Sequence, residues 1–108
     1  KVNTILRSNP EIKGVFVPSG KVGLISSLIN QRNLKIIGYD TTPVNLQYLS
    51  NNKITFLISQ KSYNQGYDSI IHMQDFLLKN VNPKIEYLSP IEIVTKENVE
   101  FIRKNYRN

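Results

Sequence analysis

The sequence contains no cysteine, and this absence excludes disulfide bonds, thiolate metal sites and cysteine nucleophiles. Its single histidine, His72, falls in a predicted helix without a partner at the spacing of metal ligands, so we read it as structural. We therefore expect no metal site and no cofactor. No apolar run is long enough to cross a membrane, and no signal peptide begins at Lys1.

Acidic residues are scarce, with 8 Asp and Glu against 14 Lys and Arg and a net charge of +6. Such an excess can attract nucleic acid or an anionic membrane. The basic residues are scattered along the chain, however, and cluster only at Arg103, Lys104 and Arg107. A solvated helix terminus explains that cluster, so we expect neither a membrane partner nor DNA binding through this chain.

Apolar patterns typical of helices and strands alternate along the 108 residues, which are enough for one domain at most. Proline and glycine separate several of the segments. Helix, strand, helix and strand in repeated succession predict an α/β fold, a three-layer parallel sheet flanked by helices. The expected strands are residues 14–17, 35–39, 54–59 and, at an edge, 91–95; the expected helices are residues 2–8, 21–33, 43–50, 65–80 and a short last one capped by Thr95 or Asn98.

Asp40 lies where the expected strand Lys35–Tyr39 ends and the next helix begins. Thr42 followed by Pro43 is typical of an N-cap residue with proline in the first helical position. Residues just beyond the carboxyl ends of parallel strands line the crevice where α/β proteins bind ligands. Asp40 could therefore accept hydrogen bonds from ligand hydroxyls, or it could only stabilise its own turn.

Polar residues follow three successive strands: Ser19 after the first, Asp40 after the second and Gln60 after the third. Parallel, adjacent strands would bring a hydroxyl, a carboxylate and an amide to one crevice, and this set suits a polyhydroxylated ligand such as a sugar. Ser19 has a second interpretation as the N-cap of the following helix. The segment around it lacks the first glycine and the Ser/Thr after lysine that a phosphate loop requires.

Acid–base catalysis would need a second titratable group near Asp40, and the sequence offers none close to a predicted strand end. We therefore predict that the chain is not an enzyme. A small α/β enzyme is the alternative from another functional class.

Three segments together resemble the lactose-repressor and ribose-binding-protein family, whose ligand-binding domain is of the type I periplasmic-binding-protein kind. They are Ile36–Pro43 (IIGYDTTP), Phe56–Gln60 (FLISQ) and Gln65–Tyr67 (QGY), and Tyr87–Asn98 resembles the closing strand of that family. The resemblance implies that Asp40 and Gln60 contact a sugar. At the position of Ser19-Gly20 the family commonly has Asn-Asp.

The resemblance covers essentially residues 1–108 and implies only the C-terminal portion of a two-lobed domain. Residues 1–60 and 88–98 would belong to the C-terminal lobe, and the helix of residues 61–80 to the other lobe. A partial domain leaves apolar surface to cover, so we expect oligomerisation or a partner chain.

The same resemblance implies the effector-binding domain of a cytoplasmic LacI-type transcriptional regulator. Such a protein senses a sugar or small polyol, forms a homodimer or higher oligomer through helices matching residues 21–33 and 43–50, and reaches DNA only through a domain absent from this chain. The alternative is a periplasmic sugar receptor of a transporter or sensor kinase.

Overall fold

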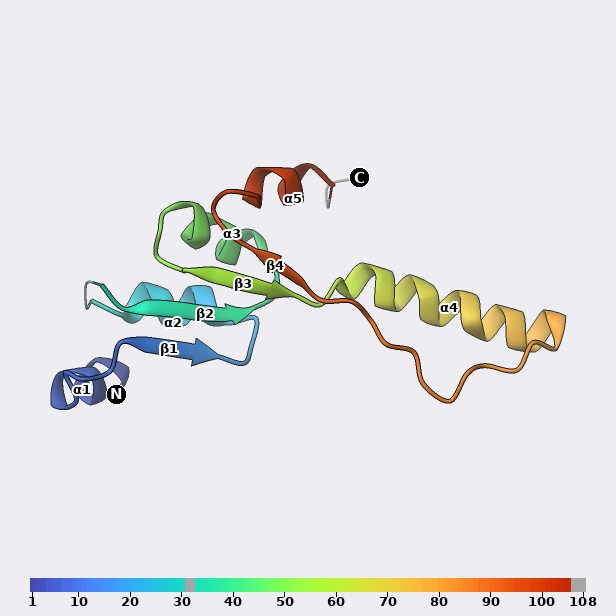
Figure 1. Cartoon of the computed structure of the whole chain (residues 1–108), viewed down its shortest axis with the longest axis horizontal. Helices are drawn as coiled ribbons and strands as arrows, with labels where there is room; N and C mark the ends of the chain where they lie inside the picture. The colour runs from blue at the N-terminus through green and yellow to red at the C-terminus, as the bar shows by residue number, and fades with distance from the viewer. Residues whose placement is uncertain (31–32, 106–108) are drawn as a thin grey trace. The chain divides into compact units, whose positions relative to one another are not determined.

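The computed structural model describes residues 1–30 and 33–105. Its chain forms two compact units: Lys1–Ser59 together with the segment from Ile93 onwards, which we call unit 1, and Gln60–Glu92, which we call unit 2. Figure 1 shows their elements, which are α1 (Val2–Ser8), β1 (Gly14–Val17), α2 (Val22–Leu28), β2 (Lys35–Tyr39), α3 (Pro43–Ser50), β3 (Phe56–Ser59), α4 (Ser62–Lys79), β4 (Glu92–Val94) and α5 (Val99–Asn105).

The strands form a sheet in the order β1-β2-β3-β4. β1 pairs with β2 and β2 with β3, both in parallel, with Gly14 opposite Lys35 and Tyr39 opposite Ile58. β4 runs in the opposite direction, as the arrows in Figure 1 show. The predicted α/β class with flanking helices and the edge position of the last strand are confirmed, and the sheet is mostly parallel, with β4 as the exception.

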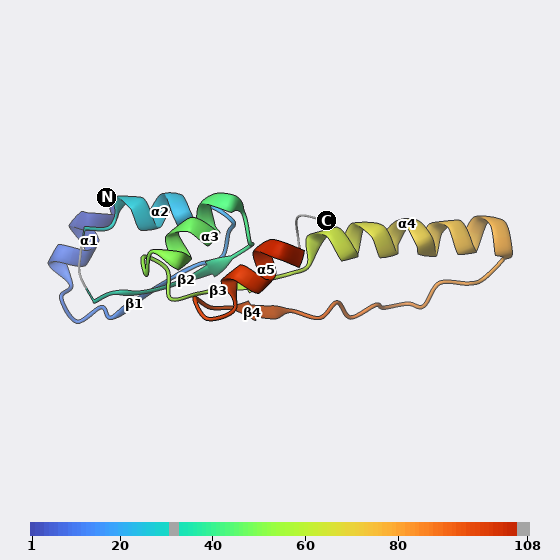
Figure 2. The ribbon, with the colours of Figure 1, turned by 90° about the horizontal axis from the view of Figure 1, so that it is seen from above.

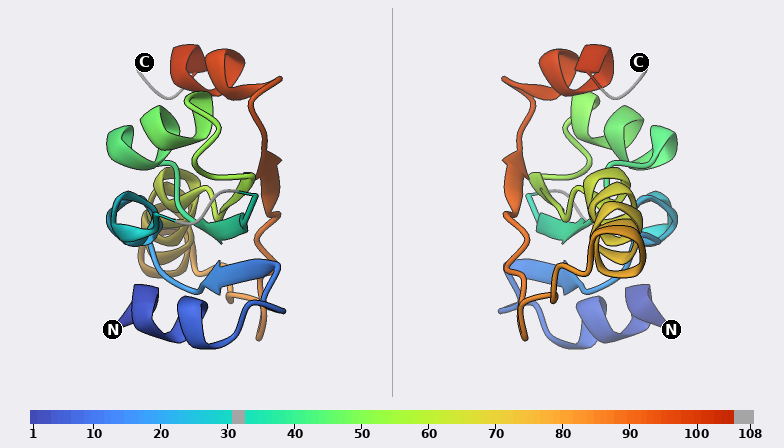
Figure 3. Two further views of the ribbon diagram at one scale, coloured as in Figure 1. Left: turned by 90° about the vertical axis from the view of Figure 1, so that its left-hand side faces the viewer. Right: turned by 90° about the vertical axis from the view of Figure 1, so that its right-hand side faces the viewer.

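The helices of unit 1 lie over one face of its sheet, as the views along and across the strands show (Figures 2 and 3). Ile36 of β2, Leu57 of β3 and Val94 of β4 are buried beneath them in one hydrophobic core. Alternate residues of each strand point to the opposite face. That face carries apolar side chains that are partly or largely exposed, namely Phe16, Ile37, Tyr39, Phe56, Ile58 and Ile93. Of the three layers that the sequence predicts, unit 1 thus contains two, the sheet and one layer of helices.

The second helix is shorter than predicted. The apolar pattern predicts a helix through Asn33, but α2 ends at Leu28 and the backbone of Ile29 is extended. Asn33 has a left-handed φ of 64°. Residues 31 and 32 lie outside the described residues. At this end of α2 the Asn3 side chain of α1 donates a hydrogen bond of 2.6 Å to the Leu28 carbonyl. That carbonyl no longer needs a helical partner, so the chain can leave the helix there.

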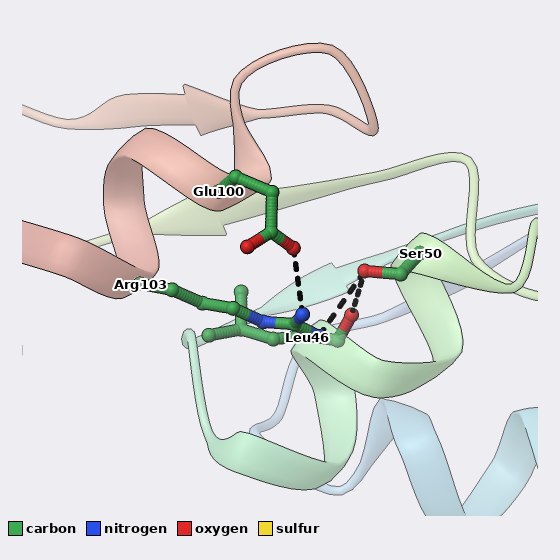
Figure 4. A network of polar contacts seen from close by, with 4 residues as sticks. All are labelled: Leu46, Ser50, Glu100 and Arg103. Carbon is green, nitrogen blue, oxygen red and sulfur yellow. Dashed lines mark hydrogen bonds and ion pairs between the residues drawn. The ribbon is translucent and has the colours of Figure 1, made fainter.

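α5 is joined to α3 by a polar network (Figure 4). The Arg103 guanidinium is paired with Glu100 on its own helix at 2.7 Å and donates a hydrogen bond of 3.1 Å to the Ser50 hydroxyl. Ser50 in turn donates to the Leu46 carbonyl one turn earlier in α3. The C-terminal helix is therefore held to α3 by polar contacts, and its residues Val99 and Ile102 are buried in the hydrophobic core.

Unit 2 consists of α4 and a segment that returns alongside it. His72 of α4 stacks on Tyr87 of the returning segment with ring centroids 4.0 Å apart. Within the described ranges no cluster of three His, Cys, Asp or Glu residues could hold a metal ion, and no helix is long and apolar enough to span a membrane. No side chain of α4 is buried. The most exposed large apolar side chains on α4 are those of Tyr63, Ile70, Met73, Leu77 and Leu78.

Candidate functional site

Asp40 directly follows β2, at the carboxyl edge of the parallel strands. Its backbone is left-handed, with a φ of 69°, a conformation that Asp and Asn tolerate better than most residues. Its N–H donates to the Ile58 carbonyl of β3 at 3.0 Å, which fixes the residue beside the neighbouring strand. The half-buried side chain thus stands at the edge where ligands bind in α/β sheets.

The start of α3 is built as the sequence predicts. Thr42 is the N-cap residue, and its hydroxyl accepts a hydrogen bond of 3.2 Å from the N–H of Asn45, while Pro43 occupies the first turn. The cap satisfies one of the free N–H groups of the first turn and sets the direction of the chain between Asp40 and the helix.

The loop between β1 and α2 lies against the Asp40 carboxylate. A Cβ placed on Gly20 would be 2.7 Å from Asp40 Oδ2, so the carboxylate fits there only because residue 20 has no side chain. The structure therefore brings the Ser19-Gly20 loop and Asp40 together, as the parallel order of β1 and β2 implies.

Ser19 is exposed and does not cap α2. Its hydroxyl accepts a hydrogen bond of 3.3 Å from the N–H of Lys21, whereas α2 begins at Val22 with Lys21 in the N-cap position. The N-cap interpretation is wrong because the chain makes a further turn before the helix starts. The predicted contact between Ser19 and a ligand stays a prediction.

Asn45 is the residue at this edge that sequence reasoning missed. It is 1% exposed, and its Nδ2 donates to the carbonyls of Gly20, Tyr39 and Asp40 at 2.9, 3.2 and 3.0 Å. Its Oδ1 accepts a hydrogen bond of 2.9 Å from the N–H of Gly23 in α2. In the sequence, Asn45 is only an asparagine in the first turn of a predicted helix. Its role could not be predicted, because its hydrogen-bond partners lie on three separate segments that only the fold brings together.

Gln60 is the next residue after Ser59, the buried last residue of β3, and it is the first residue of unit 2. Its carbonyl accepts a hydrogen bond of 2.6 Å from the Gln65 side chain in α4. The proximity of its own side chain to Asp40, which the sequence predicts, stays a prediction.

Unit 2 contains a groove of about 420 Å³ between α4 and the returning segment. Its lining includes Lys61, Asp68, His72 and Tyr87, and none of the three predicted ligand residues. The ligand contacts that the sequence predicts at the carboxyl edge of the sheet are therefore separate from this groove and stay a prediction.

The sequence profile described as periplasmic binding protein domain matches residues 1–80. The chain belongs to the periplasmic binding protein family. This match covers both the strand that ends before Asp40 and the start of α4, so the predicted resemblance is confirmed at the level of the family. Members of this family bind ligands, and the prediction that the chain is not an enzyme is confirmed by this membership. The comparison with curated proteins gave no match.

Solved structures with the same fold include a protein from Bacteroides fragilis that is provisionally assigned as a LacI transcriptional regulator. It is 29% identical, with a TM-score of 0.83 over 93% of this chain. A carbohydrate transporter solute binding protein from Agrobacterium radiobacter, in complex with D-arabinose, is 26% identical over 95% of the chain, with a TM-score of 0.77. A periplasmic solute binding protein from Actinobacillus succinogenes, with bound D-allose, is 25% identical over 92%, with a TM-score of 0.73.

The chain spans only 36% of the length of the first two structures and 37% of the third. The chain therefore corresponds to about a third of the length of these relatives in the periplasmic binding protein family.

Proposed function

We propose that this chain forms part of a two-lobed domain that senses a sugar or small polyol, with the Asp40 carboxylate as a hydrogen-bond acceptor for ligand hydroxyls. The observation that carries this proposal is the position of Asp40: it follows β2, its backbone is bonded to β3, and its carboxylate lies against Gly20 at the edge where α/β sheets bind ligands. An ionised carboxylate can accept several hydrogen bonds, which suits neighbouring sugar hydroxyls.

The proposed domain has the division that the resemblance implies. Residues 1–60 and 88–98 belong to one lobe, and the helix of residues 61–80 to the other, so that Gln60 lies at the crossover between them. The chain divides after Ser59 and before Ile93, which is close to these boundaries but places Gln60 and residues 88–92 in unit 2. This division and the apolar side chains of α4 that unit 2 leaves exposed support the proposal. Closure of two lobes on a ligand would then shift the equilibrium between two states of the whole protein.

Within this family we favour a cytoplasmic LacI-type transcriptional regulator, which would contact DNA through a further domain. The support is the Bacteroides fragilis structure, to which the chain is 29% identical with a TM-score of 0.83. A periplasmic receptor for sugar transport is the second candidate, because the two sugar-bound relatives are solute binding proteins. Sequencing upstream of Lys1 would decide between them: a helix-turn-helix there would indicate a regulator, and a signal peptide a receptor.

A homodimer or higher oligomer formed through α2 and α3 is part of the proposal. Leu24 and Leu28 of α2 and Val44 of α3 are each more than half exposed, which is unusual for large apolar side chains close together on two packed helices. Size-exclusion chromatography of the intact protein tests this point. A monomer at micromolar concentration would contradict it.

The site itself is tested by replacing Asp40 in the intact protein and measuring sugar binding by calorimetry, with D-arabinose and D-allose as first probes. Asp40→Asn keeps a residue that tolerates left-handed backbone but removes the charge, and Asp40→Ala removes both. We expect either change to weaken binding by about 1–3 kcal/mol, the scale for losing a charged or buried hydrogen-bond partner. Gln60→Ala should have a similar effect.

Glu11→Ala is the matched control, because Glu11 is an exposed carboxylate on the segment that leads into β1, at the opposite edge of the sheet. It should leave the affinity unchanged. Binding that is equally tight in the wild type, Asp40→Asn and Gln60→Ala would refute the assignment of the site.

A further inference from the structure

Asn45 connects three segments at the carboxyl edge of the sheet through one buried amide. Its NH₂ group donates to Gly20 in the β1–α2 loop and to Tyr39 and Asp40 at the end of β2. Its carbonyl oxygen accepts from Gly23 in α2. These partners fix the orientation of the amide: the two protons of the NH₂ group are shared among three carbonyls, and the oxygen accepts from the one N–H.

The backbone of Asp40 needs such support. A φ of 69° is tolerated by Asp better than by most residues but is still less favourable than the common backbone regions, so contacts that hold this turn favour it. The Asp40 N–H is held by Ile58, and its carbonyl by Asn45. Loss of the Asn45 amide would leave the Asp40 carbonyl without this donor and would free the turn to relax.

The same amide also sets the surroundings of the Asp40 carboxylate. Gly20 lies so close that an added Cβ would be 2.7 Å from Oδ2, and the Gly20 carbonyl is bonded to Asn45. Asn45 itself fits only because Gly23 lacks a side chain, since a Cβ there would lie 2.6 Å from Asn45 Oδ1. One buried side chain is therefore bonded to both segments that meet at the carboxylate, the Ser19-Gly20 loop and the end of β2.

We infer that Asn45 is a positioning residue for carbohydrate binding, which acts by fixing the Asp40 carboxylate and the Gly20 loop without touching the ligand. This inference rests on the proposed function of Asp40. Asn45 is 1% exposed, so a direct contact with a sugar is excluded in this conformation.

The test compares Asn45→Ala, and Asn45→Leu as a variant of similar volume, with Ser26→Ala in the intact protein. Ser26 is the matched control: it is also 1% exposed, and its hydroxyl donates to the Lys53 carbonyl, in the turn before β3 and away from Asp40. Calorimetry with D-arabinose and D-allose gives the affinity. NMR gives the Gly20 and Asp40 amide resonances without ligand.

We expect the Asn45 variants to bind sugar at least tenfold more weakly than the wild type, with displaced Gly20 and Asp40 resonances, and Ser26→Ala to bind within threefold of it. Equal losses in the Asn45 and Ser26 variants, or unmoved Gly20 and Asp40 resonances, would overturn the inference. A wild type that binds no sugar would refute the proposed function instead, while the NMR comparison still decides whether Asn45 positions Asp40.

Discussion

Gly38 provides a sharp test of how tightly α2 is packed on the sheet beneath the proposed site. It lies in β2, two residues before Asp40, and it is buried. A Cβ added at Gly38 would be 2.4 Å from Cβ and 2.5 and 2.6 Å from the two methyl groups of Val22. Because Val22 is fully buried and β-branched, it has no free rotamer into which it can move.

The expected effect of Gly38→Ala is a balance of two terms. Replacing glycine by alanine within a strand gains about 0.5–1 kcal/mol from the reduced backbone freedom of the unfolded chain. Inserting a methyl group into a close-packed core costs about 1–3 kcal/mol, and here the contact involves a Cβ atom that can move only with its backbone. We therefore expect the free energy of unfolding to fall by about 1–2 kcal/mol.

Gly14→Ala is the matched control, a glycine-to-alanine change at the first residue of β1. The nearest atom to a Cβ there is the Lys35 carbonyl oxygen at 3.4 Å, an ordinary contact. This variant should be neutral or slightly more stable than the wild type. Urea denaturation followed by circular dichroism gives the free energy of unfolding of both variants. If Gly38→Ala were as stable as Gly14→Ala, the inference that α2 packs closely on β2 at Gly38 would be refuted.

Two further predictions concern the turn after β4 and the helix of unit 2. The hydrogen bond from the Thr95 side chain lowers the pKa of Glu97, so Thr95→Val should raise that pKa toward its ordinary value in an NMR titration. Because the pKa of Glu97 is lower in the folded than in the unfolded state, its carboxylate stabilises the fold above the unfolded-state pKa, and this stabilisation is lost as the pH falls through the folded-state pKa. On acidification the free energy of unfolding of the wild type should therefore fall more than that of Thr95→Val. Gly66 has no heavy atom within 4 Å of an added Cβ, so Gly66→Ala should stabilise α4 in the 108-residue chain by up to about 1 kcal/mol in thermal unfolding. Destabilisation by Gly66→Ala in the intact protein alone would indicate that another part of the protein packs closely on α4.

Local signals were sufficient to predict much of the fold. The apolar run Lys35–Tyr39 forms β2, and Thr42 with Pro43 starts α3 at the predicted residue, because an N-cap and a proline act within one turn of chain. The end of α2 could not be predicted in this way. There the Asn3 side chain, 25 residues away in the sequence, caps the Leu28 carbonyl, and an apolar pattern carries no information about such a contact.

The candidate site shows the same limit. Asp40 could be selected because its place after a buried strand is visible in the sequence, and the family resemblance then supplied the class of ligand. Asn45 could not be selected, since its role depends on carbonyls and an N–H that only the folded chain brings together. The signal that could have found it is the pair of glycines at positions 20 and 23, which leave room for buried polar groups between two loops.

The two interpretations of Asp40 that the sequence left open are compatible in the structure. A turn-forming aspartate satisfies neighbouring backbone groups with its own side chain, but at Asp40 the backbone N–H is bonded to Ile58 and the carbonyl to Asn45. The left-handed turn therefore does not depend on the carboxylate for these two groups. Asn45 and Ile58 thus supply these two backbone hydrogen bonds, so the proposed ligand role of the carboxylate beside Gly20 does not require the carboxylate to supply them.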